Sequence, residues 1–161
     1  MKKKILVLVV LFSGFQMMGQ DIAKNAIGLR LGDNDGLGAE ITYQRGLSDK
    51  NRLEFDLGFR NSAEISAFKI AGLYQWVWDI DSDFNWYAGV GGGVGSWSSE
   101  IANVKNSGTF LFAAGDVGIE YNFDFPLQLS LDARPEIYVF SKGYRNSNLG
   151  PDIALSVRYK F

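Results

Sequence analysis

Hydrophobic and polar residues alternate along most of this chain with a period of two. In LEFDLGFR (53–60), the odd positions are apolar, whereas the even positions hold Glu, Asp, Gly and Arg. The same alternation is found in LQLSLDARPE (127–136) and in IALSVRYKF (153–161). Successive side chains of a β-strand point to opposite faces. Each segment therefore predicts a strand with one apolar face and one polar face.

Such segments make up nearly all of the chain after its first twenty residues. Turn-rich pieces such as GLSDKN, DIDSDFN and FDFP separate them, and no segment shows a helical stripe. The pattern predicts an all-β protein with eight antiparallel strands, at 25–32, 37–45, 52–60, 65–78, 85–97, 108–123, 127–140 and 151–161.

Two architectures fit eight alternating strands, a soluble lipocalin-like barrel with an apolar interior and a transmembrane barrel with an apolar exterior. The charges favour the second. In a narrow lumen positive and negative side chains must nearly balance, because an unpaired buried charge costs several kcal/mol. The polar faces carry a near-balanced set, which we expect to form a lumen charge network: Arg30, Glu40, Glu54, Asp56, Arg60, Lys69, Asp116, Glu120, Asp132, Arg134, Glu136 and Arg158. The sequence thus predicts an eight-stranded antiparallel up-and-down transmembrane β-barrel, with the soluble ligand-binding barrel as the alternative.

The amino terminus has the form of a secretory signal peptide. Three lysines at 2–4 precede an apolar run from Ile5 to Phe12, and Gly19 offers a small residue for cleavage. The run is too short to span a bilayer, which takes about 20 residues. We expect a signal peptide at 1–19 and a barrel domain at 20–161. Without the signal peptide, 13 basic and 18 acidic residues remain, a net charge of −5.

Aromatic residues gather near one set of predicted strand ends, as in the interfacial girdle of a membrane barrel: Tyr43, Trp76, Trp78, Trp86, Tyr121, Phe123, Tyr159 and Phe161. If both termini lie in the periplasm, the longer connections at 97–108 and 141–151 face outward. These outer loops would carry Trp97, Glu100, Lys105, Lys142, Tyr144 and Arg145.

The stretch GVGGGVG (89–95) places four glycines on the lumen face of one strand. Its spacing matches neither a dinucleotide fingerprint nor a P-loop. The interior of an eight-stranded barrel is just wide enough for side chains to fill. A strand without inward side chains therefore leaves room for bulky neighbours, for which we propose Phe110, Phe112, Tyr138 and Phe140. Pro135 interrupts the seventh strand, and a bulge or a place near the outer rim would accommodate it.

Composition excludes several kinds of chemistry. The chain has no Cys and no His, which removes disulfides, thiolate ligands and the commonest general base. The acidic turn DIDSD lacks the later glycine and glutamate of a calcium loop. We therefore expect no catalytic residue, cofactor or metal site, and the negative net charge does not favour nucleic acid.

GIEYNFDFPLQLSLDARPEIY (118–138) and the closing IALSVRYKF resemble segments of small outer-membrane barrels of Bacteroidota-type bacteria. The resemblance is to OmpA/OmpX-like eight-stranded barrels, covers 25–161, and includes no peptidoglycan-binding domain. It implies a place in the cell outer membrane, contact with its lipid, and recognition by the barrel-assembly machinery through Tyr159 and Phe161 as the assembly signal.

These observations favour a non-enzymatic barrel with a structural role in the envelope or a surface-interaction role, in which the outer loops meet an extracellular partner. A small ion or solute channel is an alternative, although paired charges would close the lumen. Lipid-modifying enzymes of similar shape use a His with a Ser nucleophile, an arrangement that this chain cannot build. Within the predicted network, Glu120, Asp132, Arg134 and Glu136 are expected to meet one another and Arg158, since their strands are sequential neighbours.

Overall fold

The structure is a computed structural model that describes residues 22–161 apart from 34–36, 62–64, 102–103, 142–148 and 151. No helix among the residues described is long and apolar enough to cross a bilayer. The strands are β1 (Asn25–Asp33), β2 (Leu37–Ser48), β3 (Asn51–Asn61), β4 (Ile65–Asp79), β5 (Phe84–Ile101), β6 (Val104–Asn122), β7 (Leu127–Ala133), β8 (Glu136–Ser141), β9 (Leu149–Gly150) and β10 (Ile153–Lys160).

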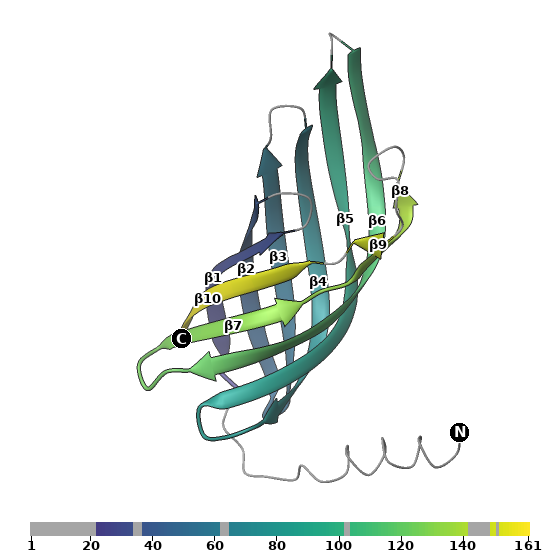
Figure 1. The fold of residues 1–161 in the computed structure, drawn as a ribbon. Helices are drawn as coiled ribbons and strands as arrows, with labels where there is room; N and C mark the ends of the chain where they lie inside the picture. Colours follow the sequence, from purple (N-terminus) through teal and green to yellow (C-terminus); the bar gives the residue numbers. More distant parts are fainter. Residues whose placement is uncertain (1–21, 34–36, 62–64, 102–103, 142–148, 151) are drawn as a thin grey trace, which may run out of the picture.

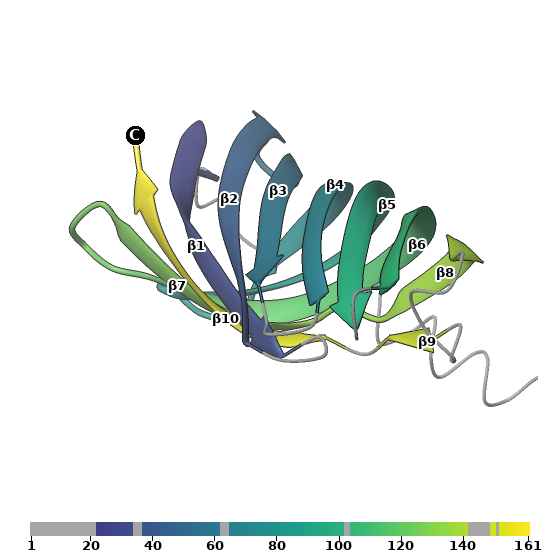
Figure 2. The same ribbon diagram turned by 90° about the horizontal axis from the view of Figure 1, so that it is seen from above.

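These strands form one closed antiparallel barrel. Each of β1 to β4 pairs with the next, β5 pairs with β6, and β6 pairs with both β7 and β8. β7 with β8, and β9 with β10, are each the two parts of one interrupted strand, so the barrel has eight strands in up-and-down order (Figures 1 and 2). The predicted fold class is confirmed.

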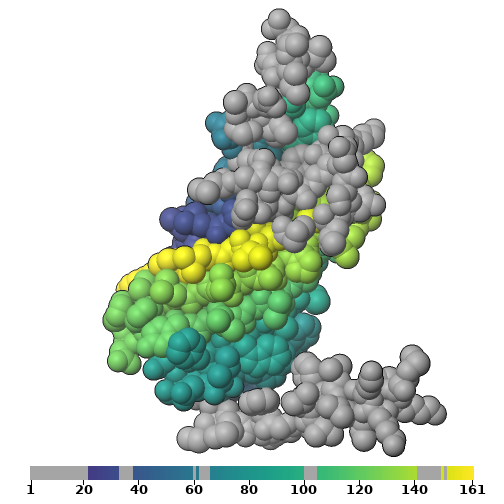
Figure 3. Space-filling model, viewed as in Figure 1, coloured from purple at the N-terminus to yellow at the C-terminus, as the bar shows by residue number. Residues whose placement is uncertain are grey.

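The barrel closes where its last strand meets its first. β10 lies between β1 and β7, and Figure 3 shows it as the yellow band between them. Beyond the strand, the amide of Asn25 donates to the carbonyl of Phe161 at 3.1 Å, and the amide of Phe161 donates to the carbonyl of Asn25 at 2.9 Å. The hydrogen-bonded ring is therefore complete to the end of the chain.

Burial is the reverse of that in a soluble protein. Four arginines are among the largest fully buried side chains: Arg30, Arg52, Arg134 and Arg158. Leucines of the alternate positions are on the outside, with Leu29 54% and Leu131 48% exposed. An exposed apolar surface of this extent needs lipid around it. A soluble carrier barrel, which needs an apolar interior, does not fit this arrangement.

The glycine stripe of β5 makes room for aromatic rings, as its parity predicts. Phe110, Phe112 and Tyr138 are buried, and their rings lie 5.7 to 6.3 Å apart. A Cβ atom on Gly93 would come within 2.6 Å of the Phe112 ring, one on Gly95 would come still closer to the Phe110 ring, and both would also meet a backbone oxygen of β4. Only glycine at these two positions lets the rings pack against the β5 backbone.

Phe140, which was expected to share this space, points outward instead and is 47% exposed. The register explains the difference: Phe112 pairs with Tyr138, whereas Leu111 pairs with Phe140, which leaves Val139 as the extra residue of a bulge. A bulge shifts every later side chain to the opposite face.

Pro135 lies between β7 and β8, and the pairing with β6 continues past it. Val117 pairs with Ala133 and Ala114 with Glu136, so the register is the same on both sides of the break. The amide of Gly115 donates to the carbonyl of Pro135 at 3.1 Å. The proline thus interrupts the strand without moving the side chains beyond it to the other face.

The expected outer loop at 97–108 is largely strand. β5 and β6 pair from Phe84 and Tyr121 as far as Ile101 and Val104, with Glu100 opposite Lys105, and their hairpin extends beyond the other strands (Figure 1). The segment has no apolar alternation, so its sequence gave no strand signal. In the second expected loop, Lys142, Tyr144 and Arg145 lie outside the described residues.

Aromatic rings surround the opposite end of the barrel, where the short turns lie. Trp78 stacks on Trp86 at 4.3 Å between ring centroids, and Tyr121 packs between Phe84 and Phe123 at 4.7 Å from each. Such rings are suited to a membrane interface, and since short turns are typical of the periplasmic side of such barrels, we take this end as the periplasmic one.

Candidate functional site

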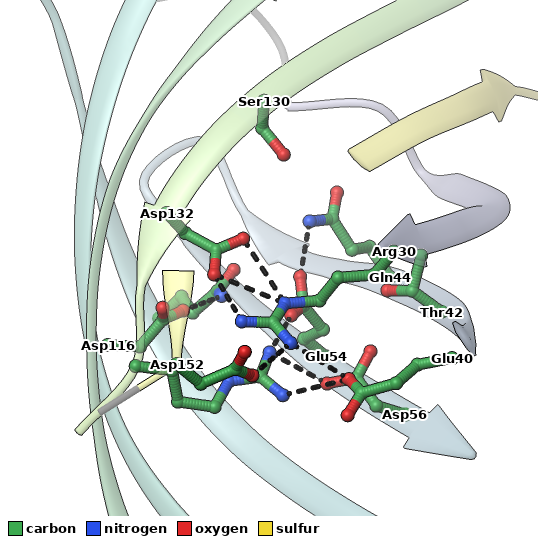
Figure 4. A network of polar contacts seen from close by, with 12 residues as sticks. Arg30, Glu40, Thr42, Gln44, Glu54, Asp56, Asp116, Ser130, Asp132 and Asp152 are labelled. Carbon is green, nitrogen blue, oxygen red and sulfur yellow. Dashed lines mark hydrogen bonds and ion pairs between the residues drawn. The ribbon is translucent and has the colours of Figure 1, made fainter. Parts of the chain in front are cut away.

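The lumen is the site at which charged side chains converge. Strand alternation directs buried carboxylates and guanidinium groups inward from β1, β2, β3, β6, β7, β8 and β10, and Figure 4 shows most of the carboxylates gathered around Arg30. In the order of the chain, the buried acidic residues are Glu40, Glu54, Asp56, Asp116, Glu120, Asp132, Glu136 and Asp152.

Arg30 joins three carboxylates from three strands. Its Nη2 lies 2.5 Å from Asp132 Oδ2, and its Nη1 lies 2.6 Å from Asp152 Oδ2 and 3.1 Å from Glu40 Oε2. The Arg30 side chain is fully buried. Planar guanidinium groups suit such multiple contacts because their donors point in several fixed directions.

Arg134 extends the cluster across the lumen. It contacts Glu54 Oε1 at 2.8 Å, Asp56 Oδ2 at 2.9 Å and Glu40 Oε2 at 3.3 Å. Glu54 in turn contacts Arg158 Nη2 at 3.0 Å through its other oxygen. Glu40 therefore links Arg30 to Arg134, and Glu54 links Arg134 to Arg158.

A further layer lies on each side of this centre. Toward the outer end, Lys69 Nζ lies 2.7 Å from Glu40 and 2.8 Å from Glu136. Toward the periplasmic end, Arg52 Nη1 lies 2.7 Å from Glu120, and the Arg52 guanidinium lies 4.7 Å from the ring centroid of Tyr87.

The structure thus brings eleven of the twelve predicted lumen residues inside the barrel; the side chain of the twelfth, Arg60, lies outside the described part. Their partners differ from those expected. The ion pairs of Arg134 run to β2 and β3, those of Glu120 to β3 and those of Asp132 to β1, rather than among β6, β7, β8 and β10. Long side chains reach across a narrow lumen, so neighbours in the chain need not be partners.

Arg52 and Asp152 were missed, although each shares the parity of predicted lumen residues on its own strand.

Neutral polar side chains also face the lumen and bind the charged groups. Gln44 Nε2 donates to Glu54 at 2.6 Å, Gln75 Nε2 donates to Asp116 at 2.5 Å, and Arg158 donates to Ser130 Oγ at 2.7 Å. Parity alone would have identified all of these residues as inward-facing.

The side chains described in the lumen carry more negative than positive charge, since eight buried carboxylates face five cations, Arg30, Arg52, Lys69, Arg134 and Arg158. Within the described part of the chain, Asp116 has no ion-pair partner within 4.0 Å, and its Oδ2 accepts a hydrogen bond from Gln75 Nε2. No group of three or more potential metal ligands occurs among the described residues.

No protein-family model and no curated protein sequence matches the chain. Solved structures do. The amino-terminal β-barrel domain of Pseudomonas aeruginosa OprF matches with a TM-score of 0.72 at 14% identity, covering 89% of this chain and 100% of that one. Neisserial surface protein A matches with a TM-score of 0.65 at 13% identity, covering 85% and 94%. Ail of Yersinia pestis, the attachment invasion locus protein, matches with a TM-score of 0.57 at 16% identity, covering 90% and 100%.

At these identities the likeness concerns the fold. It agrees with the closed ring, the apolar exterior and the aromatic band, each of which follows from this chain alone. The chain has the fold of the small eight-stranded outer-membrane β-barrels.

Proposed function

We propose that the protein is a non-enzymatic barrel of the cell outer membrane, exported through a signal peptide at residues 1–19, that has an envelope-structural or surface-interaction role. The observation that carries this proposal is the reversed burial: ionic groups lie in the core and apolar side chains surround it. Only a barrel surrounded by lipid gains from this arrangement, since lipid requires every backbone group to be paired and tolerates an apolar surface.

The extended β5–β6 hairpin is the part best placed for surface contacts. It reaches beyond the other strands on the side opposite the aromatic band (Figure 1). Lipid is the partner of the barrel wall, and an extracellular partner would meet this hairpin. Tyr159 and Phe161, 56% and 62% exposed, would present the assembly signal to the barrel-assembly machinery.

Cell fractionation combined with heat-modifiable gel mobility tests the location. The protein should be recovered with the outer membrane and should migrate differently before and after boiling. Recovery in a soluble fraction would refute the proposal. Lipid A from a deletion strain should match that of the wild type, and a change in its acylation would point to an enzyme instead.

A small channel is the second candidate, because a polar recess enters the lumen from the periplasmic end. Arg52, Asn85, Glu120 and Gln128 line it, and Arg52 Nη2, Asn85 Oδ1 and Gln128 Oε1 have no hydrogen-bond partner among the described residues. The central charge cluster lies above this recess. Purified barrel in planar bilayers should therefore show no steady conductance, whereas stable ion-selective openings would favour the channel.

A further inference from the structure

The outer wall of the barrel carries a single cation at the level of the aromatic band. Arg45 of β2 pairs with Asn25 of β1 and Leu53 of β3. Its side chain faces outward by parity, since Ile41 is 46% exposed, whereas Gln44 is buried in the lumen. At this end of the barrel, every other outward-facing position of the described strands holds an uncharged side chain. A charge on a lipid-facing surface is costly unless it lies at the interface or has a partner.

Two neighbours fix the height of this guanidinium group on the wall. Arg45 Nη1 donates to Asn25 Oδ1 at 2.7 Å, and the Tyr43 hydroxyl donates to the same oxygen at 2.8 Å. Tyrosines at a membrane interface place their hydroxyls among the lipid headgroups and their rings against the acyl chains. The shared acceptor therefore places the Arg45 guanidinium group at the depth of the lipid phosphates.

The Arg45 guanidinium group has unused hydrogen-bond donors. Within the described part of the chain, no carboxylate lies within 4.0 Å of it, and Asn25 Oδ1 is its one hydrogen-bond acceptor. A guanidinium group has further N–H donors and can bind a phosphate through two of them at once. The Arg45 side chain is also partly exposed, in contrast to the fully buried arginines of the lumen.

An apolar strip extends from this cation toward the middle of the wall. The exposed side chains of Ile27, Leu29 and Ile41 form it. They adjoin one another across β1 and β2, since Ile27 pairs with Tyr43 and Leu29 pairs with Ile41. The acyl chains of a lipid with its headgroup at Arg45 would lie along this strip, so the wall offers both parts of a phospholipid a suitable surface.

We propose that Arg45 binds the phosphate group of a phospholipid in the periplasmic leaflet. The guanidinium group donates two hydrogen bonds to phosphate oxygens, and the acyl chains of the same lipid pack on Ile27, Leu29 and Ile41. A lipid rather than a soluble phosphate is the ligand, because the cation lies on the lipid-facing wall and not in the lumen. The proposal rests on the proposed location of the barrel in the outer membrane, with its aromatic end toward the periplasm.

Native mass spectrometry of the purified full barrel, released from detergent micelles, tests this site with dioleoylphosphatidylglycerol as the probe. Dioleoylglycerol, which has the same chains and no phosphate, is the matched neutral lipid. The first phospholipid molecule should bind saturably and at least about tenfold more tightly than dioleoylglycerol, because hydrogen bonds between charged groups are the strong ones. Equal affinity for the two lipids would overturn the proposal. Displacement of the phospholipid by glycerol phosphate would also overturn it, since the site would then be one for a soluble phosphate.

Three variants locate the bound phosphate. Arg45→Gln should weaken binding of the first phospholipid at least about fivefold and remove most of the preference over dioleoylglycerol. Arg45→Lys should give an intermediate affinity, since an ammonium group keeps the charge but cannot form the bidentate contact. Lys160→Gln is the control, because it removes a cation at the same end of the barrel that lines the lumen recess instead of the wall, and the affinity should stay within about twofold.

Folding of each variant is checked first by its gel mobility without boiling. If Arg45→Gln fails to fold, Arg45→Lys and the comparison of the two lipids still decide the matter. An unchanged affinity in Arg45→Gln, or an equal loss in Lys160→Gln, would place the lipid elsewhere and overturn the proposal. Recovery of the protein in a soluble fraction would contradict the proposed function itself, whereas an outer-membrane barrel without a preference for the phospholipid would contradict this proposal alone.

Discussion

Replacing Glu54 with glutamine removes the carboxylate that joins two buried arginines. Arg134 keeps Asp56 at 2.9 Å and Glu40 at 3.3 Å, so it retains counter-charges. Arg158 is left with hydroxyl acceptors, Ser130 at 2.7 Å and Thr42 at 3.3 Å. Removing one partner of a buried ion pair costs about 3–5 kcal/mol, because the remaining charge stays desolvated. We expect Glu54→Gln to lower the free energy of unfolding by about this amount.

Asp116→Asn is the matched control. Asp116 is buried like Glu54, but its contact is a hydrogen bond from the Gln75 amide, which an asparagine oxygen can still accept. Its replacement should change the free energy of unfolding by no more than about 1 kcal/mol. The two substitutions are chemically alike, so the difference between them measures the loss of ion pairing.

The assay is urea unfolding of the barrel in phospholipid vesicles, followed by tryptophan fluorescence under conditions in which unfolding is reversible. A cycle with Arg158→Gln isolates the pair: the double variant should recover at least about 1 kcal/mol relative to the sum of the single effects. Glu54→Gln and Asp116→Asn with equal effects, together with an additive cycle, would refute the account of the lumen as an ion-paired network.

Three further predictions concern other parts of the barrel. Gly93→Val should destabilise the barrel by about 1–3 kcal/mol through overpacking, and adding Phe112→Ala should restore part of this lost stability. Gly72→Ala is the control and should be tolerated, because a Cβ there meets the Phe55 ring at an ordinary 3.7 Å. Urea unfolding measures the stability of all three variants. Deleting Phe161 should reduce the folded, heat-modifiable fraction in cells, and undiminished assembly would count against its part in the assembly signal. Leu131→Arg should cost about 2–4 kcal/mol in vesicles, as expected for a cation on the lipid face near the bilayer midplane, and a cost near zero would place this residue away from lipid.

Alternation was enough to predict which way most side chains face, because strand periodicity and barrel closure leave little freedom. Arg30 and Asp132 are inward-facing by parity alone. Their contact could not be predicted, since it depends on how far the strands are staggered around the ring. Because the stagger was unknown, the partners of Arg134, which lie on β2 and β3, could not be predicted either.

The alternation of apolar and polar residues also could not predict local irregularities of the strands. The bulge at Val139 turned Phe140 outward, and nothing in the residues 136–141 marks which one is extra. The β5–β6 hairpin continues through residues that show no regular apolar alternation, where pairing between strands extends the sheet. The glycine stripe, in contrast, did allow a prediction, because an absent side chain in a narrow lumen predicts a bulky neighbour.

The most direct test of the central claim compares two leucines of the unmodified protein. With methyl-labelled leucine in the barrel in lipid nanodiscs, the methyl groups of Leu131, 48% exposed, should show strong nuclear Overhauser effects to lipid acyl chains. Those of Leu73, 1% exposed and packed against Phe110 and Phe112, should show none. Acyl-chain contacts at Leu73 without contacts at Leu131 would mean that the barrel faces lipid with its other surface, and the ion-paired lumen would be contradicted.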